Sequence, residues 1–178
     1  MPLGAARFGL LGGVADLGKL ELIETQTVSG VTDVDFTSID ESTYNVHFAT
    51  WQFEKVVGRM DIRLYENGVL ETGNVYQYAR QTGQTSGSFG ESKSTGFGGI
   101  PLDVGVSNAQ SQGYIYFYNL GDSSKYSFST LQSFIESYGF TFGSGVLPQA
   151  STVDGIRFRN IDTANITGTL SLYGIAES

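Results

Sequence analysis

Apolar and polar residues alternate along much of the chain, which is the pattern of β-strands that bury one face. The clearest example is the segment 43–51, in which Val46 and Phe48 fall on one face and His47 and Trp51 on the other. Further segments repeat this period of two and are rich in β-branched and aromatic residues. The strands predicted in this way cover residues 19–28, 34–36, 43–51, 59–65, 69–79, 113–118, 140–142, 153–158 and 166–175.

Turn residues divide these strands. Asn67-Gly68 lies between the segments 59–65 and 69–79, and Asn-Gly readily adopts the positive φ angles of a two-residue hairpin turn. The stretch 81–113 is rich in Gly, Ser, Thr and Gln. We therefore predict a long functional loop there, with short strands around Phe89 and within 100–106.

One segment, 129–138, has the period of a helix instead. Its apolar residues are spaced i, i+3, i+4 and i+7, a capping pair opens it, and Gly139 follows its end. These features predict one short helix. The apolar positions are Leu131, Phe134, Ile135 and Tyr138.

The number and spacing of the strands predict an all-β fold. Eight to ten short strands with one short helix favour a jelly-roll β-sandwich, and an immunoglobulin-like sandwich is the alternative. The first 18 residues contain frequent glycines, and we expect them to form an N-terminal arm. We expect residues 19–178 to form a single β-sandwich domain.

Composition and net charge exclude some classes of binding partner. The chain of 178 residues has a net charge of -8, so nucleic acid and anionic membrane surfaces are poor partners. The sequence holds no apolar run of the roughly 20 residues that cross a bilayer, so we expect no membrane insertion. Cysteine is absent, which excludes disulfides and fits folding in a reducing cytoplasm.

Candidate catalytic and metal-ligating residues are sparse. His47 is the one histidine, so a Ser-His-Asp triad or a histidine-based metal site would have to use it, and a strand histidine with a structural role is the simpler interpretation. Asp33, Asp35 and Asp122 lie near turn glycines but lack a calcium-loop spacing. We expect no enzyme activity, no cofactor and no metal site.

Aromatic residues are the better candidates for contact with a ligand or partner. Tyr114, Tyr116 and Tyr118 fall on one face of the 113–118 strand, while Phe89 and Phe97 lie in the glycine-rich stretch. Tyrosine and phenylalanine make rigid contacts with sugars and proteins. The alternative is that both strand faces are buried in a sandwich or an oligomer.

Six phrases of the sequence point to a known family: MPLGAARFGL (1–10), LELIETQT (20–27), STYNVHF (42–48), YIYFYNL (114–120), FGSGV (142–146) and TLSLYGI (169–175). Together they resemble a family of small β-rich structural proteins from marine bacteriophages, many of them cyanophages. The resemblance implies a virion protein, made in the host cytoplasm and located in a tail fibre, a receptor-binding tip or a capsid decoration. It carries no catalytic residues to transfer.

From this resemblance we expect a surface-exposed tail-fibre or receptor-binding component. The alternatives are a capsid decoration or cement protein that stabilises the head and, third, a polysaccharide depolymerase. By analogy with trimeric jelly rolls we expect a homotrimer that contacts other virion proteins and a host surface glycan or protein. The arm residues expected to attach the protein to its neighbour are Arg7, Phe8, Leu10 and Leu11.

Overall fold

The structure, a computed structural model, describes residues 19–102 and 106–176. The expected arm, with Arg7, Phe8, Leu10 and Leu11, lies outside the described residues. The strands are β1 Leu20–Val31, β2 Asp33–Phe36, β3 Val46–Gly58, β4 Met60–Glu66, β5 Val69–Leu70, β6 Tyr76–Gln84, β7 Phe89–Phe97, β8 Ile100–Pro101, β9 Val106–Tyr118, β10 Ser127–Ile135, β11 Gly139–Leu147, β12 Val153–Asn160 and β13 Ile166–Ile175.

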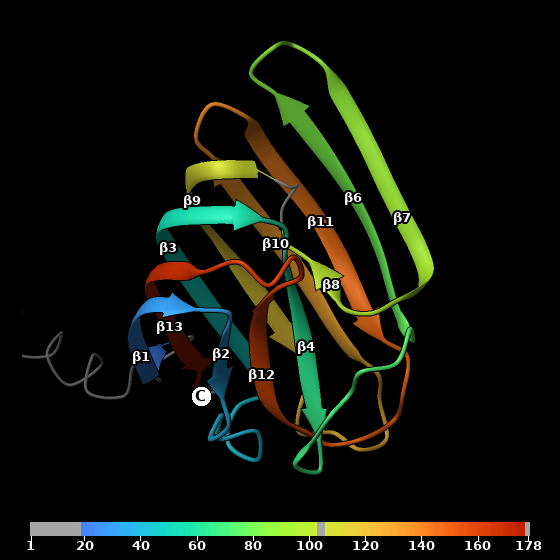
Figure 1. The fold of residues 1–178 in the computed structure, drawn as a ribbon. Coiled ribbons are helices and arrows are strands. Elements are labelled where there is room, and N and C mark those ends of the chain that lie inside the picture. The colour runs from blue at the N-terminus through green and yellow to red at the C-terminus, as the bar shows by residue number, and fades with distance from the viewer. Residues whose placement is uncertain (1–18, 103–105, 177–178) are drawn as a thin grey trace, which may run out of the picture.

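These strands form two antiparallel sheets packed face to face (Figure 1). The large sheet has the order β1-β13-β3-β9-β10-β11-β6-β7, and the small sheet has the order β2-β12-β4-β5, with β8 paired to β4. The all-β sandwich predicted from the sequence is confirmed. The 13 strands of the described residues exceed both the eight of a jelly roll and the seven to nine of an immunoglobulin-like sandwich, so the jelly-roll class stays a prediction.

The core lies between the sheets and is built from alternate residues of each strand. On β3, His47, Ala49, Trp51 and Phe53 are buried, whereas the residues between them point away from the core. The indole ring of Trp51 contacts the ring of Phe158 from the small sheet, with centroids 6.1 Å apart. The period of two in the sequence therefore separates the two faces of this strand correctly, and the structure shows that the face with His47 and Trp51 is the buried one.

The predicted Asn-Gly hairpin is also confirmed. Asn67 and Gly68 have φ angles of 51° and 77°, the left-handed values that a two-residue hairpin turn requires. The turn joins β4 to β5, but β5 ends at Leu70. The predicted strand at 69–79 is therefore wrong in extent, because the chain leaves the small sheet and begins β6 in the large sheet at Tyr76.

The predicted helix at 129–138 is wrong. Residues 127–135 form β10, and their side chains alternate between buried and exposed along the whole strand. Ser129 and Ser133 occupy buried positions, where their hydroxyls donate to the carbonyl oxygens of Gly145 and Leu102 at 3.4 and 2.8 Å. Because serines stand where apolar residues would be expected, the alternation is hidden and Leu131, Phe134, Ile135 and Tyr138 resemble a helical face.

The predicted long loop at 81–113 is largely a pair of strands. β6 continues to Gln84, and β7 pairs with it antiparallel from Phe89 to Phe97. Gly87, with a φ angle of 88°, lies in the short turn between them. The glycines and hydroxyl residues of 81–97 therefore belong to an edge hairpin of the large sheet, whereas residues 106–113 belong to β9.

Candidate binding face

The outer face of the large sheet carries a concentration of aromatic side chains, which we call the aromatic face. Its rings come from five neighbouring strands, β13, β3, β9, β10 and β11, of which β9, β10 and β11 are consecutive in the sequence. Five of these side chains are more than a third exposed. The aromatic face comprises Phe48, Tyr114, Tyr116, Tyr118, Phe128, Phe134, Phe140, Phe142 and Tyr173, of which Tyr114, Phe128, Phe134, Phe140 and Phe142 are the exposed ones.

Three predicted contact residues, Tyr114, Tyr116 and Tyr118, lie together on the aromatic face. Strand pairing places Phe48 opposite Tyr116, and their ring centroids are 4.7 Å apart. The Tyr114 hydroxyl donates to Oε1 of Gln132 at 2.8 Å. The tyrosines are thus held by neighbouring strands, and their alternation with buried Ile115 and Phe117 follows from the strand geometry.

Phe89 also points to the outer side, at the end of a row of paired residues. Phe134 pairs with Phe140, Phe140 with Gly83, and Gly83 with Phe89. A Cβ atom at Gly83 would lie 2.5 Å from the Phe140 ring, so the absence of a side chain at this glycine leaves the space that the ring occupies. Phe89 itself is 81% exposed on the edge strand.

Phe97 does not join this group. It lies opposite the buried Tyr76, and residues paired in this way share one side of a sheet. Its half-buried ring packs edge-on against Tyr78, with centroids 5.4 Å apart. The structure therefore separates Phe97 from the other predicted contact residues.

Sequence reasoning missed four exposed phenylalanines, Phe128, Phe134, Phe140 and Phe142. The signal that could have found them is the alternation over 127–135, which places Phe128 and Phe134, six residues apart, on the same side of the strand. Reading that segment as a helix removed Phe134 from the surface. The reading of 140–142 as a strand already put Phe140 and Phe142 on one face.

A groove with a volume of about 530 Å³ crosses the middle of the aromatic face. Its walls combine rings of Tyr114, Phe134 and Phe140 with the amides of exposed glutamines, and Thr and Ser hydroxyls close one end. Of the residues that the structure describes, those that line the groove include no Asp, Glu, Lys or Arg. The glutamines and hydroxyl residues are Gln52, Gln112, Gln132, Thr50, Thr169 and Ser171.

His47 lies on the opposite side of the same sheet. It is fully buried, with Nε2 2.7 Å from the carbonyl oxygen of Ile39 and its ring edge-on to Tyr44. Burial lowers the pKa of His47, which favours the neutral imidazole as a donor to that carbonyl. Within the described residues, no group of three or more His, Asp or Glu side chains could hold a metal ion.

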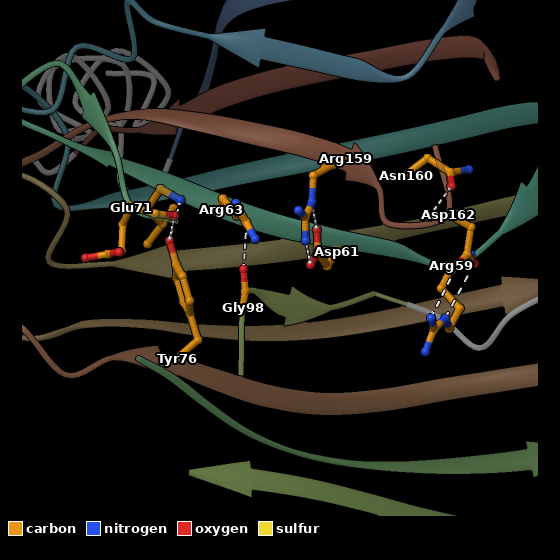
Figure 2. A network of polar contacts seen from close by, with 10 residues as sticks. Arg59, Asp61, Arg63, Glu71, Tyr76, Gly98, Arg159, Asn160 and Asp162 are labelled. Atoms are coloured by element: carbon orange, nitrogen blue, oxygen red, sulfur yellow. Dashed lines mark hydrogen bonds and ion pairs between the residues drawn. The ribbon is translucent and has the colours of Figure 1, made fainter. Parts of the chain in front are cut away.

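The outer face of the small sheet differs in chemistry. Arg157 and Arg159 make two-pronged ion pairs with Asp35 and Asp61, at N–O distances of 2.6 to 2.9 Å. Asp61 is fully buried, and Figure 2 shows it facing Arg159. Burial raises the pKa of Asp61, although the Arg159 guanidinium opposes this effect. Two arginine–aspartate pairs on this face thus neutralise each other, whereas the aromatic face offers uncharged rings and amides.

Comparisons with known proteins give a structural likeness alone. No family model matches the sequence, and no curated protein matches it either. Among solved structures, the fold is similar to part of the exo-inulinase of Aspergillus awamori, with 12% sequence identity and a TM-score of 0.49. That likeness covers 90% of this chain and 30% of the exo-inulinase chain, so this protein spans less than a third of that length. In the described part of the chain, no helix is long and apolar enough to cross a membrane.

Proposed function

We propose that the protein is a non-enzymatic structural protein of a bacteriophage virion that attaches to its target through the aromatic face. Its place is a tail fibre or receptor-binding component. The virion part of the proposal is supported by the family resemblance of the sequence phrases. The attachment part rests on a single observation, the concentration of exposed rings on the aromatic face.

The exposed apolar surface is the reason to assign contact to this face. Large side chains such as Phe128, Phe134 and Phe142 are each close to half exposed, and they lie on adjacent strands. Contiguous apolar patches on a soluble protein mark places where another molecule binds. Charged groups on this side lie at its margins in the described residues, including Glu91 and Lys93 on the edge strand β7.

The test uses the purified full chain and the phage that carries it. A gold-labelled antibody against the protein is expected to mark the tail or fibre tips of intact particles. Excess purified protein is expected to inhibit adsorption of the phage to host cells. A double variant, Phe134→Ser with Phe142→Ser, should lose most of this inhibition because its rings no longer bury against the target.

The matched control is Val69→Ser, an exposed apolar residue on β5 of the small sheet, which should inhibit like the wild type. Sedimentation and thermal unfolding should show that both variants keep the fold and the oligomeric state. Label spread evenly over the head, with no inhibition of adsorption, would refute attachment and identify a capsid decoration protein. Reducing-end release from host glycans would instead support a depolymerase.

A further inference from the structure

The groove on the aromatic face has the chemistry of a sugar site rather than of an apolar protein interface. Exposed rings from β9, β10 and β11 alternate with exposed glutamine amides from β3, β9 and β10. Carbohydrates present apolar C–H faces together with hydroxyl groups. Flat rings can cover the first, and side-chain amides can both donate to and accept from the second.

Strand pairing arranges these groups in two parallel rows. Gln52 pairs with Gln112, which pairs with Phe134 and then Phe140. The second row, displaced by two residues along each strand, holds Thr50, Tyr114 and Gln132. The rows are therefore about 7 Å apart.

The two rows run across the strands rather than along them. From Thr169 on β13 to Phe140 on β11 the groove spans five strands, or about 19 Å at the usual strand spacing. An extended ligand with repeating units fits such a track better than a single small molecule does.

The hydrogen-bonding groups of the groove retain capacity for a ligand. Gln132 accepts from the Tyr114 hydroxyl at 2.8 Å, which orients its amide. A glutamine side chain has two N–H donors and a carbonyl with two lone pairs, so one bond does not exhaust it. Gln52 and Gln112, which also line the groove, are exposed as well.

Charge then selects the kind of sugar. The described lining of the groove contains no acidic or basic side chain, and Glu136 lies in the adjoining hollow beyond Phe134. An acidic polysaccharide would meet no cation in the groove and would be repelled by the net charge of -8. A neutral sugar needs no cation in the groove and is not repelled by the net charge of the protein.

We propose that the groove binds a neutral oligosaccharide chain of the host envelope, which lies across β13, β3, β9, β10 and β11. Sugar rings stack on Tyr114, Phe134 and Phe140, and their hydroxyls bond the amides of Gln112 and Gln132. This inference rests on the proposed attachment function and names its ligand class.

The first experiment measures adsorption of the fluorescently labelled full chain to host cells after treatment with periodate or with protease. Periodate cleaves the vicinal diols of sugars, so we expect it to abolish adsorption, whereas protease should leave adsorption intact. Adsorption that survives periodate would overturn the glycan proposal and leave attachment standing. Absence of adsorption to untreated cells would instead overturn the attachment function itself.

The second experiment separates the extracted envelope polysaccharide on an anion exchanger. The unretained, neutral fraction should compete with cells for the protein, and competition by the retained, acidic fraction alone would contradict the charge argument. Gln112→Ala and Gln132→Ala should each need roughly tenfold more of the neutral fraction for half competition. Gln77→Ala, on β6 outside the groove, is the matched control and should behave as the wild type. Unchanged competition by both groove variants would exclude the groove as the site.

Discussion

At the scale of single residues, His47 combines full burial with a polar role. Its Nε2 lies against the carbonyl of Ile39, and burial lowers the pKa below the ordinary value of 6.5. The unfolded chain therefore binds a proton more readily than the folded protein just below pH 6.5. The stability that a neutral His47 confers is complete above that pH and is lost as the pH falls.

We predict that the free energy of unfolding decreases between pH 7 and pH 5 by more in the wild type than in His47→Gln. Glutamine can donate to the Ile39 carbonyl but does not titrate. Urea unfolding at several pH values measures the difference. Parallel pH profiles for the two proteins would contradict the assignment of a lowered pKa to His47.

Gly113 shows how closely the backbone of β9 approaches its neighbours. A Cβ atom there would lie 2.3 Å from Trp51 Cζ2 and 2.5 Å from the carbonyl oxygen of Gln132. Gly113→Ala should therefore reduce the free energy of unfolding by about 1 to 3 kcal/mol through overpacking. Gly90→Ala is the control, since no atom lies within 4 Å of a Cβ at that position. Equal stability of the two variants by chemical denaturation would argue against the packing described for Trp51.

Much of the residue-scale pattern could be predicted from the sequence. The inward positions of Ile62 and Leu64 on β4, and of Leu170 and Leu172 on β13, follow from alternation alone. The exposed position of Phe134 could not be predicted in this way, because buried serines in β10 hide the alternation and leave a helical spacing. The hydrogen bond from Ser133 to the Leu102 carbonyl satisfies the buried serine hydroxyl. It joins residues 31 positions apart, so no local pattern reveals it.

At the scale of elements, the small sheet is tied together by ion pairs between neighbouring strands. Asp61 on β4 and Arg159 on β12 face each other in the register, and Gly99 packs so closely over Asp61 that a Cβ would lie 2.5 Å from its carboxylate. Arg59 and Asp162 form a second pair beside it, but both side chains of that pair are exposed (Figure 2).

These two pairs should differ in their contribution to stability. Asp61→Ala leaves Arg159 without its partner in a largely covered position and should lower the free energy of unfolding by about 3 kcal/mol. Arg59→Ala should cost less than about 1 kcal/mol, because solvent screens the exposed pair. Thermal or urea unfolding of the two variants makes the comparison. A larger loss for Arg59→Ala would contradict the burial of Asp61.

The order of the strands within the two sheets could not be predicted from the sequence, for a physical reason. Strand positions such as 43–51 and 166–175 are local signals, whereas the pairing of β13 with both β1 and β3 depends on contacts across more than 100 residues. The crossing from β5 to β6 is equally hidden, because nothing local to residues 71–75 says which sheet receives the next strand.

At the scale of the whole molecule, the two outer faces give the sandwich two different surfaces. The small sheet presents two arginine–aspartate ion pairs, and the large sheet presents rings, amides and hydroxyls. The aromatic face could not be predicted from any one segment, because β13, β3, β9, β10 and β11 each contribute only a few of its residues. The tyrosines of β9 were the part of it visible in the sequence.

The expected homotrimer remains a prediction at this scale. We expect sedimentation equilibrium of the full chain to give three times the monomer mass, and we expect Phe134→Ser with Phe142→Ser to leave that mass unchanged because the aromatic face contacts the target. Dissociation of the double variant into monomers would show that the aromatic face is a subunit interface instead.

Hydroxyl-radical footprinting of the full chain on host cells tests the central claim, binding through the aromatic face, most directly. Compared with the free protein, oxidation of Tyr114, Phe134 and Phe140 should fall on binding, while oxidation of Tyr65 and Val69 on the small sheet should stay the same. Protection of Tyr65 and Val69, with an aromatic face as reactive as in the free protein, would contradict the account.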